Sequence, residues 1–227
     1  MMKKLLIFSF LFFQTISAEP AEAGIRVNQF INDSIWLGKN GDSIWGGSIT
    51  GSVSVYTDNT CSASIGLFGG SIGDLILNNP RSGLIYTPLI VGGGELVITG
   101  SLKIESADAT LSTSLPNATQ SDDTAVIRFI KDQWISPGKT LFIDNKFIFD
   151  GSGMSFSIDG MIAVDESSDS LTLRNMTLRG LHSGWINAIY ANQVILDNVK
   201  IVGNNLQAPL LWVVPGSISG FAEFIDA

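Results

Sequence analysis

Two segments of the chain repeat one ten-residue pattern at a spacing of 23 residues. Residues 171–180 read LTLRNMTLRG and residues 194–203 read VILDNVKIVG. In both segments apolar and polar side chains alternate, which is typical of half-buried β-strands. Asn175 and Asn198 shift the alternation by one residue, so the chain must bend there to keep its apolar side chains on one face. Asparagine tolerates the left-handed backbone of such a corner. The side chains expected in the core are Leu173, Leu178, Leu196 and Ile201.

A third and less regular copy occupies residues 141–151 and places Asn145 at the corner position. The interval from Asn145 to Asn175 is longer than the interval between the other two copies. A further apolar stretch follows each copy, with markers spaced by 27 and 22 residues at Ile162, Ile189 and Leu211. These intervals predict a solenoid with three strands in each turn. We expect Asn145, Asn175 and Asn198 to occupy equivalent corners of successive turns and to stack as a ladder of amides.

An asparagine ladder in a coil of three strands per turn resembles the parallel β-helix of the pectin-lyase-like superfamily. The likeness covers residues 139–214 and, less closely, residues 45–106. It implies an all-β fold, a right-handed parallel β-helix (β-solenoid) with about 22–30 residues per rung and an irregular N-terminal β region. The chain looks most like a bacterial surface β-solenoid segment of the autotransporter-passenger type. The hand of the coil follows from this resemblance.

The first 23 residues have the layout of a secretory signal peptide. Lys3 and Lys4 precede an apolar run over residues 5–13, and small residues follow up to Ala23. We expect cleavage after Ala18 or after Ala23, which leaves a secreted protein or one at the bacterial cell surface or in the periplasm. An uncleaved membrane anchor is the alternative, but the run is shorter than a membrane-spanning helix requires.

The charge of the chain argues against nucleic acid and anionic lipid as partners. There are 13 basic and 21 acidic residues. Cleavage after Ala18 removes Lys3 and Lys4 and leaves 11 basic residues, hence a formal charge of −10. A surface of this sign repels phosphate backbones and favours solubility. Cys61 is the single cysteine, so it forms no intrachain disulfide, and we interpret it as a small buried apolar residue.

Composition divides the exported chain into two parts. Residues 24–120 form a Gly- and Ser-rich β region, interpreted as a cap with irregular rungs, and residues 121–227 form the regular rungs. Residues 49–55 and 98–104 both begin Ile-Thr-Gly-Ser, and each glycine is expected at a corner between strands. Residues 106–123 break the alternation and are predicted to be a long loop. Residues 125–134 fit a short helix or a strand equally well.

The repeat fails near the C-terminal end of the sequence. The residue 23 places after Asn198 is Phe221, which is not a corner residue. If residues 215–220 are an inserted loop, residues 221–225 become the next strand. The apolar run 210–214 then lies next to an uncapped edge, which favours strand addition from another chain. We therefore expect self-association through this edge, and a rung pattern that belongs to a truncated protein.

Few residues offer catalytic chemistry. Residues 69–73 match G-x-S-x-G, but they lie in a β-rich region, and His182 is the single histidine. Asp165, Glu166 and Asp169 carry enough oxygens for calcium, but we interpret them as a solvated acidic turn and predict no cofactor or metal. Arg174 and Arg179 face outward by the alternation, so a lyase arrangement stays open. We predict no catalytic residue.

Trp36 and Trp45 stand in two copies of D-S-I-W-x-G. Together they are candidates for a flat platform on which sugar rings stack, and burial in a cap is the alternative. The sequence therefore favours an exported, non-catalytic β-solenoid, similar to an adhesin or passenger, that binds a glycan or a protein at a cell surface. The alternatives are a polysaccharide lyase or glycosidase fragment, and a truncated fragment without independent function.

Overall fold

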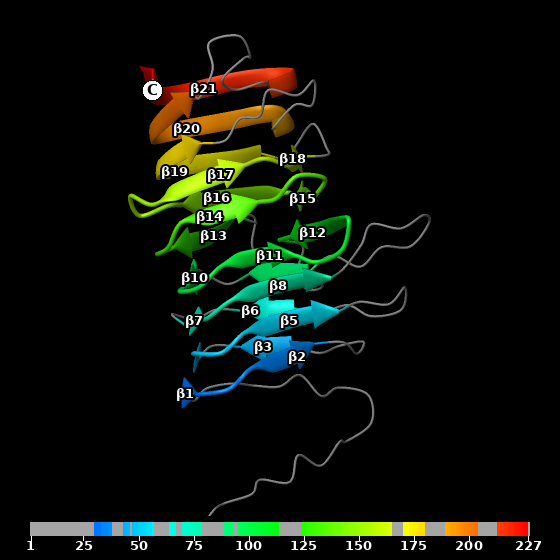
Figure 1. Ribbon diagram of the computed structural model, residues 1–227. Helices are drawn as coiled ribbons and strands as arrows, with labels where there is room; N and C mark the ends of the chain where they lie inside the picture. Colours follow the sequence, from blue (N-terminus) through cyan, green and yellow to red (C-terminus); the bar gives the residue numbers. More distant parts are fainter. Residues whose placement is uncertain are drawn as a thin grey trace, which may run out of the picture.

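The computed structural model describes eleven segments of the chain, which all belong to one stack of strands (Figure 1). They are residues 30–37, 43–45, 47–56, 64–66, 70–78, 89–92, 95–113, 124–164, 170–179, 189–203 and 213–226. The predicted signal peptide, Cys61, His182 and the acidic turn 165–169 lie outside the described residues. Every regular element in these segments is a β-strand, so none of them contains a helix able to cross a membrane.

The described segments contain twenty-one strands. They are β1 (Phe30–Ile31), β2 (Ile35–Leu37), β3 (Ser43–Trp45), β4 (Ser48–Ile49), β5 (Val53–Tyr56), β6 (Ser64–Gly66), β7 (Ser71–Ile72), β8 (Leu75–Asn78), β9 (Leu89–Gly92), β10 (Glu95–Ile98), β11 (Leu102–Ile104), β12 (Asp108–Ser112), β13 (Thr124–Phe129), β14 (Gln133–Ile135), β15 (Thr140–Asp144), β16 (Lys146–Asp150), β17 (Ser155–Ile158), β18 (Met161–Val164), β19 (Ser170–Arg179), β20 (Ile189–Gly203) and β21 (Val213–Asp226).

Strands pair in parallel with the strand three places later in the chain, as β1 with β4 and β4 with β7. Each turn therefore contributes one strand to each of three faces. We call the face of β1, β4, β7, β10, β13 and β16 the first face, that of β2, β5, β8, β11, β14 and β17 the second, and that of β3, β6, β9, β12, β15 and β18 the third. The last strands run around corners, so that β19 pairs with both β16 and β17.

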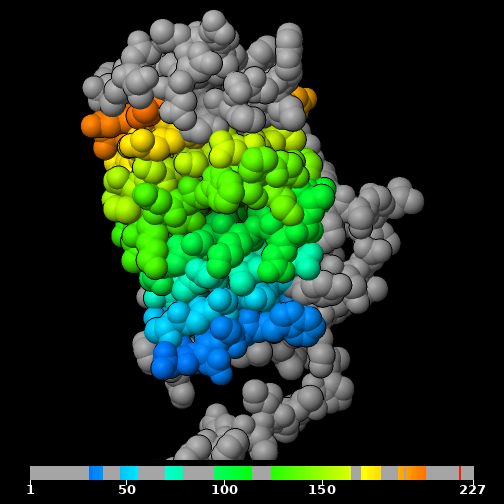
Figure 2. Space-filling model, viewed as in Figure 1, coloured from blue at the N-terminus to red at the C-terminus, as the bar shows by residue number. Residues whose placement is uncertain are grey.

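This arrangement confirms the all-β parallel solenoid. The chain climbs steadily along one axis, from β1 in blue to β21 in red (Figure 1), and the described residues in the space-filling view follow the same order from blue to orange (Figure 2). Turns differ in length: a short turn joins Phe30 to its partner Ser48, and a long one joins Asp108 to its partner Thr140. The variation is possible because each turn needs only its three short strands in register, while connections of different length leave the stack. Among the described residues, stacking is already present at Phe30, which precedes the range 45–106 of the weaker resemblance.

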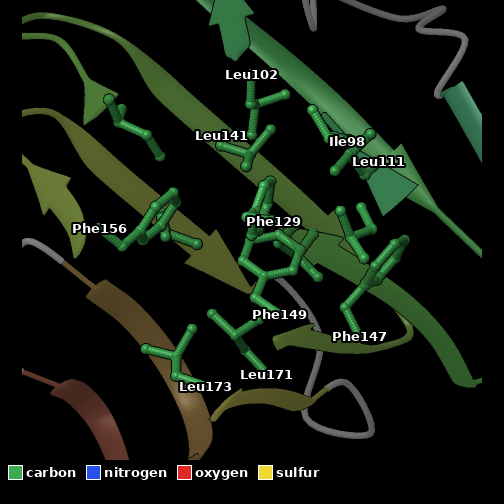
Figure 3. Packing of buried hydrophobic residues seen from close by; sticks show 14 of the residues in the cluster. Ile98, Leu102, Leu111, Phe129, Leu141, Phe147, Phe149, Phe156, Leu171 and Leu173 are labelled. Atoms are coloured by element: carbon green, nitrogen blue, oxygen red, sulfur yellow. The ribbon is translucent and has the colours of Figure 1, made fainter. Parts of the chain in front are cut away.

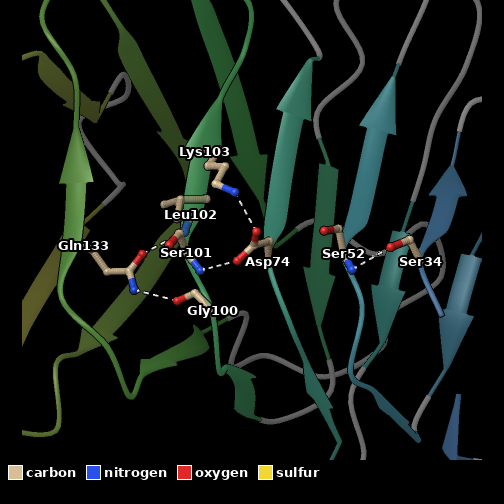
Figure 4. Close-up of polar contacts among 8 residues, drawn as sticks. All are labelled: Ser34, Ser52, Asp74, Gly100, Ser101, Leu102, Lys103 and Gln133. Atoms are coloured by element: carbon tan, nitrogen blue, oxygen red, sulfur yellow. Dashed lines mark hydrogen bonds and ion pairs between the residues drawn. The ribbon is translucent and has the colours of Figure 1, made fainter. Parts of the chain in front are cut away.

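One junction of the second face is made by a side chain. The N–H of Leu102 in β11 donates to Oε1 of Gln133 in β14 at 2.7 Å, and Nε2 of Gln133 donates to the Gly100 carbonyl at 3.0 Å (Figure 4). Gln133 is buried, with 3 % of its surface exposed. Its amide supplies a donor and an acceptor like those of a peptide group, and so satisfies the backbone where the ladder of strands is interrupted.

The core follows the predicted alternation. Leu173, Leu178, Leu196 and Ile201 are all buried, as the repeat indicates. Four phenylalanines fill the middle turns (Figure 3). Phe129 stacks on Phe156 at a centroid distance of 5.6 Å, and it meets Phe149 edge-on at the same distance. These aromatic contacts join the first and second faces across the interior.

The structure decides or corrects three local expectations. Residues 125–134 form strands β13 and β14 and no helix. The loop predicted over residues 106–123 is wrong for residues 108–112, which are β12 and pair with β15. In this strand Thr110 and Ser112 are buried together with Ala109 and Leu111, so its hydroxyl side chains do not mark an exposed loop. Residues 215–220 are part of the continuous strand β21, so the inserted loop is also wrong.

The corner between the first and second faces is lined by glycines in the N-terminal turns. The N–H of Gly73 donates to the Gly51 carbonyl at 3.1 Å, and that of Gly100 donates to the Gly73 carbonyl at 3.0 Å. A Cβ on Gly73 would lie 2.3 Å from the Gly51 oxygen. The predicted glycine corners at Gly51 and Gly100 are therefore confirmed, and they lie on one edge of the solenoid.

Candidate functional site

The same edge of the solenoid carries the asparagine ladder in the later turns. Asn175 and Asn198 have φ values of 51° and 54°, the left-handed backbone predicted for them. Nδ2 of Asn198 donates to Oδ1 of Asn175 at 2.9 Å. Pairing of Arg174 with Asp197 and of Met176 with Val199 places the two asparagines directly above one another. The ladder is confirmed for this pair.

Asn145 does not belong to that ladder, so this part of the prediction is wrong. Its φ of 71° does make a corner, but the corner joins β15 to β16, between the third and first faces. The N–H of Ser170 donates to the carbonyl of Asn145 at 3.0 Å. The turn above Asn145 therefore places Ser170 next to it, and not Asn175. The reason is the length of the turn. Lys146, next to Asn145, pairs with Ser170 on the turn above. Asn175 comes five residues after Ser170, so one turn from Asn145 does not reach as far as Asn175.

Asp150 takes the ladder position below Asn175. Its Oδ1 accepts the Ser152 N–H at 3.0 Å and Nδ2 of Asn175 at 3.4 Å. Its Oδ2 accepts Nε of Arg174 at 2.8 Å. Burial alone would raise the pKa of Asp150, but the bonds from Ser152, Arg174 and Asn175 outweigh burial and hold the pKa below its usual value. The carboxylate is therefore ionised and fully engaged at neutral pH.

A wider turn follows Asp150 and shapes the surface above it. The N–H of Met154 donates to the Gly151 carbonyl at 2.8 Å, and φ is 49° at Ser152 and 88° at Gly153, as in a type I′ turn. The next two turns of the solenoid have single asparagines at this corner. Beside the turn lies a polar groove of about 560 Å³, which we call the corner groove. It is lined by Arg128, Asp150, Ser152, Gly153, Asn175, Met176, Thr177, Asn198 and Lys200.

Charges alternate along the first face beside the corner groove. Arg128 pairs with Asp150, Asp150 with Arg174, and Arg174 with Asp197 on successive turns. An Nη2 of Arg128 also lies 2.6 Å from Oε1 of Glu95. Opposite charges on adjacent parallel strands stabilise the stack, although exposed pairs contribute little each. The side chain of Asp150 is the exception, since only 6 % of its surface is exposed.

The tryptophans predicted to form a sugar platform lie on different faces. Trp36 is on β2 in the second face, and 58 % of its surface is exposed. Trp45 is on β3 in the third face, and its side chain lies outside the described part of the structure. A platform shared by the two on one face is therefore ruled out by the strand positions. Trp134 on β14 shares the second face with Trp36 instead, is 57 % exposed, and donates from Nε1 to Asp159 at 2.7 Å.

Trp134 and the corner groove are neighbours on the second face. Trp134 pairs with Ser157, and Ser157 pairs with Arg179. Two residues earlier on the same strands, Ser155 pairs with Thr177, and Thr177 pairs with Lys200. Thr177 and Lys200 line the groove, and Trp134 itself does not. We call the second-face surface that reaches from Trp134, across Ser157 and Arg179, to the groove the strip.

The two arginines considered for a lyase face outward, as predicted, and both are hydrogen-bonded. Arg174 holds Asp150, and Nε of Arg179 donates to Oγ of Ser155 at 3.2 Å. Within the described segments, no three His, Cys, Asp or Glu side chains are grouped to hold a metal ion. The calcium candidates Asp165, Glu166 and Asp169 are in the part of the chain that the structure leaves undescribed.

Sequence reasoning missed Asp150, Ser152, Thr177, Lys200 and Trp134. A signal for Asp150 was present, because Arg128, Asp150, Arg174 and Asp197 recur at the turn length with alternating sign. Ser152 carried none, since serine seldom adopts the left-handed backbone found here. Comparison with protein-family models, with curated proteins and with solved structures gave no match to this chain.

Proposed function

We propose that this chain is an exported, non-catalytic β-solenoid that recognises a glycan at a cell surface, in the manner of an adhesin or passenger segment. Its place is outside the cytoplasm, either secreted, at a bacterial cell surface or in the periplasm. The fold is consistent with the pectin-lyase-like resemblance of the sequence, and this finer assignment is part of the proposal.

The strip formed by Trp134 and the corner groove supports this function most directly. An exposed indole, fixed by its bond to Asp159, offers a flat apolar face to the C–H surface of a sugar ring. The amides of Asn175 and Asn198 and the hydroxyls of Ser152 and Thr177 line the groove, one to three turns further along the axis. Such groups exchange hydrogen bonds with sugar hydroxyls, and a stack of paired strands holds them in place without a ligand.

The state of Asp150 favours binding over hydrolysis. A general acid must hold a proton near neutral pH, and this usually requires a raised pKa. The pKa of Asp150 is lowered instead, and its oxygens already accept three hydrogen bonds. A polysaccharide lyase or glycosidase fragment is the second candidate. For that reading, the outward Arg174 and Arg179 are the supporting observation.

Binding to an array of glycans tests the main proposal, with the exported chain purified without residues 1–23. Trp134→Ala should weaken binding to any glycan found by about fivefold or more, since stacking on an aromatic side chain contributes about 1 kcal/mol or more. Tyr190→Ala is a matched control, because Tyr190 is 41 % exposed and belongs to the third face. Equal losses in both variants, or an array without binders, would contradict glycan recognition by this strip.

A turnover assay separates the scaffold from the enzyme. We expect no release of unsaturated or reducing sugar from pectate, pectin or similar anionic polymers, with or without calcium. Turnover that disappears in Arg179→Ala and is retained in Lys146→Ala would decide for the lyase. Lys146 serves as the control because it is exposed at the start of β16, on another corner of the solenoid.

Export is tested by expressing the whole chain with its leader and measuring the mass of the mature protein. Cleavage after Ala18 or Ala23 is the expected result. A membrane-bound product that keeps its leader would favour the alternative, an uncleaved membrane anchor.

A further inference from the structure

Two exposed tryptophans share one column of outward side chains on the second face. From turn to turn the column rises through paired residues, which are Trp36 on β2, Ser54 on β5, Ile76 on β8 and Lys103 on β11. These four strands climb one above the other in Figure 1, and β14 follows them with Trp134. The column therefore begins and ends with an indole.

The column continues across the junction between β11 and β14. Gln133 accepts the N–H of Leu102, which places β14 above β11 (Figure 4). Trp134 and Lys103 are the residues that follow Gln133 and Leu102, and both are exposed. Trp36 and Trp134 are thus four turns apart. At the usual strand spacing this is at least about 19 Å along the axis.

The two indoles are also the most exposed of the large apolar side chains that the structure describes. Trp36 is 58 % exposed and Trp134 is 57 % exposed, ahead of Ile130 and Tyr190. Single exposed apolar side chains are ordinary on a protein surface. Two indoles at the same position of one face define a line along which flat groups can stack. One sugar ring meets one indole, whereas a chain of sugar units meets both.

The surface between the indoles is low and its charge is compensated. Ser54 and Ile76 are half-buried, so the indoles stand above them. The ammonium group of Lys103 lies 2.6 Å from Oδ2 of Asp74 (Figure 4). This bond uses one of three N–H donors, so Lys103 can also donate to a hydroxyl. On a chain with a net charge of −8, a column without excess positive charge favours neutral polymers over anionic ones.

We propose that Trp36 and Trp134 are the two ends of one binding site for a neutral, linear polysaccharide that lies along the solenoid axis. This inference rests on the proposed glycan recognition and names the charge, the length and the direction of the ligand. Sugar rings stack on both indoles, and the units between them lie over Ser54 and Ile76. The paired strands fix the distance between the indoles, so the second contact adds affinity only for a chain long enough to reach both.

The test uses soluble oligosaccharides of cellulose, xylan and chitin, from the disaccharide to the hexasaccharide. All three series are neutral, linear and extended, and oligogalacturonides are the anionic comparison. Binding is measured by calorimetry with the exported chain purified without residues 1–23. We expect at least one neutral series to bind, with an affinity that rises at least tenfold from the shortest to the longest member.

Trp36→Ala should abolish this rise with chain length and leave the binding of the shortest members at Trp134 within twofold. Trp36→Tyr should keep most of the rise, because a second aromatic ring remains at the end of the column. Tyr190→Ala is the matched control on the third face and should change neither quantity. Unchanged melting temperatures in these variants distinguish a lost contact from a lost fold.

Four results would overturn the inference: an affinity that does not depend on chain length, equal effects of Trp36→Ala and Tyr190→Ala, tighter binding of oligogalacturonides, or no binding by any neutral series. In each case an array glycan that depends on Trp134 leaves the proposed function standing. An array on which no glycan depends on Trp134 contradicts the proposed function itself.

Discussion

Asp150 shows how a single residue connects the corner ladder to the charges of the first face. Its folded pKa is depressed, so it contributes stability that is present above the unfolded value of about 4 and is lost as the pH falls through the folded pKa. Asp150→Asn removes the charge but keeps the shape, and it leaves Arg174 without its partner. We expect a loss of about 1–3 kcal/mol in the free energy of unfolding at pH 7.

Urea unfolding of both proteins between pH 3 and pH 7 measures this effect. The difference between wild type and Asp150→Asn should begin to shrink below about pH 4, where the carboxylate of the unfolded chain takes up its proton, and should continue to shrink as the pH falls through the lower folded pKa. A difference that stays constant down to pH 3 would show that the charge of Asp150 is not what stabilises the corner.

The asparagine corner allows a second comparison at the residue scale. Asn175→Ala loses the amide bonds to Asn198 and Asp150 and also places a Cβ-bearing residue without local hydrogen bonds in a left-handed backbone. We expect a cost of about 1.5–3.5 kcal/mol, the sum of about 1–2 for the backbone and about 0.5–1.5 for a hydrogen bond. Asn175→Gly removes the amide alone, so it should cost less. Equal costs, measured by chemical unfolding, would assign the whole effect to the amide.

The limits of prediction are also clear at this scale. The left-handed backbone of Asn145, Asn175 and Asn198 followed from the phase shift in each segment, because only a corner keeps the apolar set inward. The turn on which each corner lies did not follow. A local pattern does not say which of the three corners it forms, and Asn145 lies at the corner before β16, one strand earlier than the corner of Asn175.

At the scale of the element, alternation predicted buried positions well wherever outward side chains were large or charged. It failed for β12, where Thr110 and Ser112 are almost completely buried although they alternate with Ala109 and Leu111. The predicted Trp platform failed for a related reason. Two copies of D-S-I-W-x-G nine residues apart fall on successive strands of one turn, and successive strands belong to different faces.

Strand β20 provides the test of core packing. Leu196 is 3 % exposed and pairs with Leu173 on the turn below. Leu196→Ala should reduce the free energy of unfolding by about 2–5 kcal/mol. The neighbouring Ile195 points to the other side of the strand and is half-buried, so Ile195→Ala is the control and should cost clearly less. A cost below about 0.5 kcal/mol for Leu196→Ala would place that side chain outside the core.

At the scale of the molecule, the stack places chemically different corners on one edge. Glycines occupy the edge from Gly51 to Gly100, and Asp150, Asn175 and Asn198 continue it. In the following turn Gly220, with a φ of 99°, takes the positive-φ position, and Asp197 and Val199 pair with the consecutive residues Phe221 and Ala222. This shift by one residue explains why the 23-residue repeat meets Phe221 where a corner residue was expected.

Strand β21 leads to the last prediction. Among the described residues, it pairs with β20 on one side and with no other strand. A long strand with one unpaired side is a site for pairing with another chain. The N–H and C=O groups on that side of the last strand need hydrogen-bond partners, and a solenoid without a cap offers few others. We expect the exported chain, purified without residues 1–23, to associate in a concentration-dependent manner, measured by analytical ultracentrifugation. Val213→Lys should weaken association, because a charge at the beginning of β21 opposes strand pairing. A chain that stays monomeric at high concentration, with the amides of β21 protected from hydrogen exchange, would show that this edge is covered within the molecule.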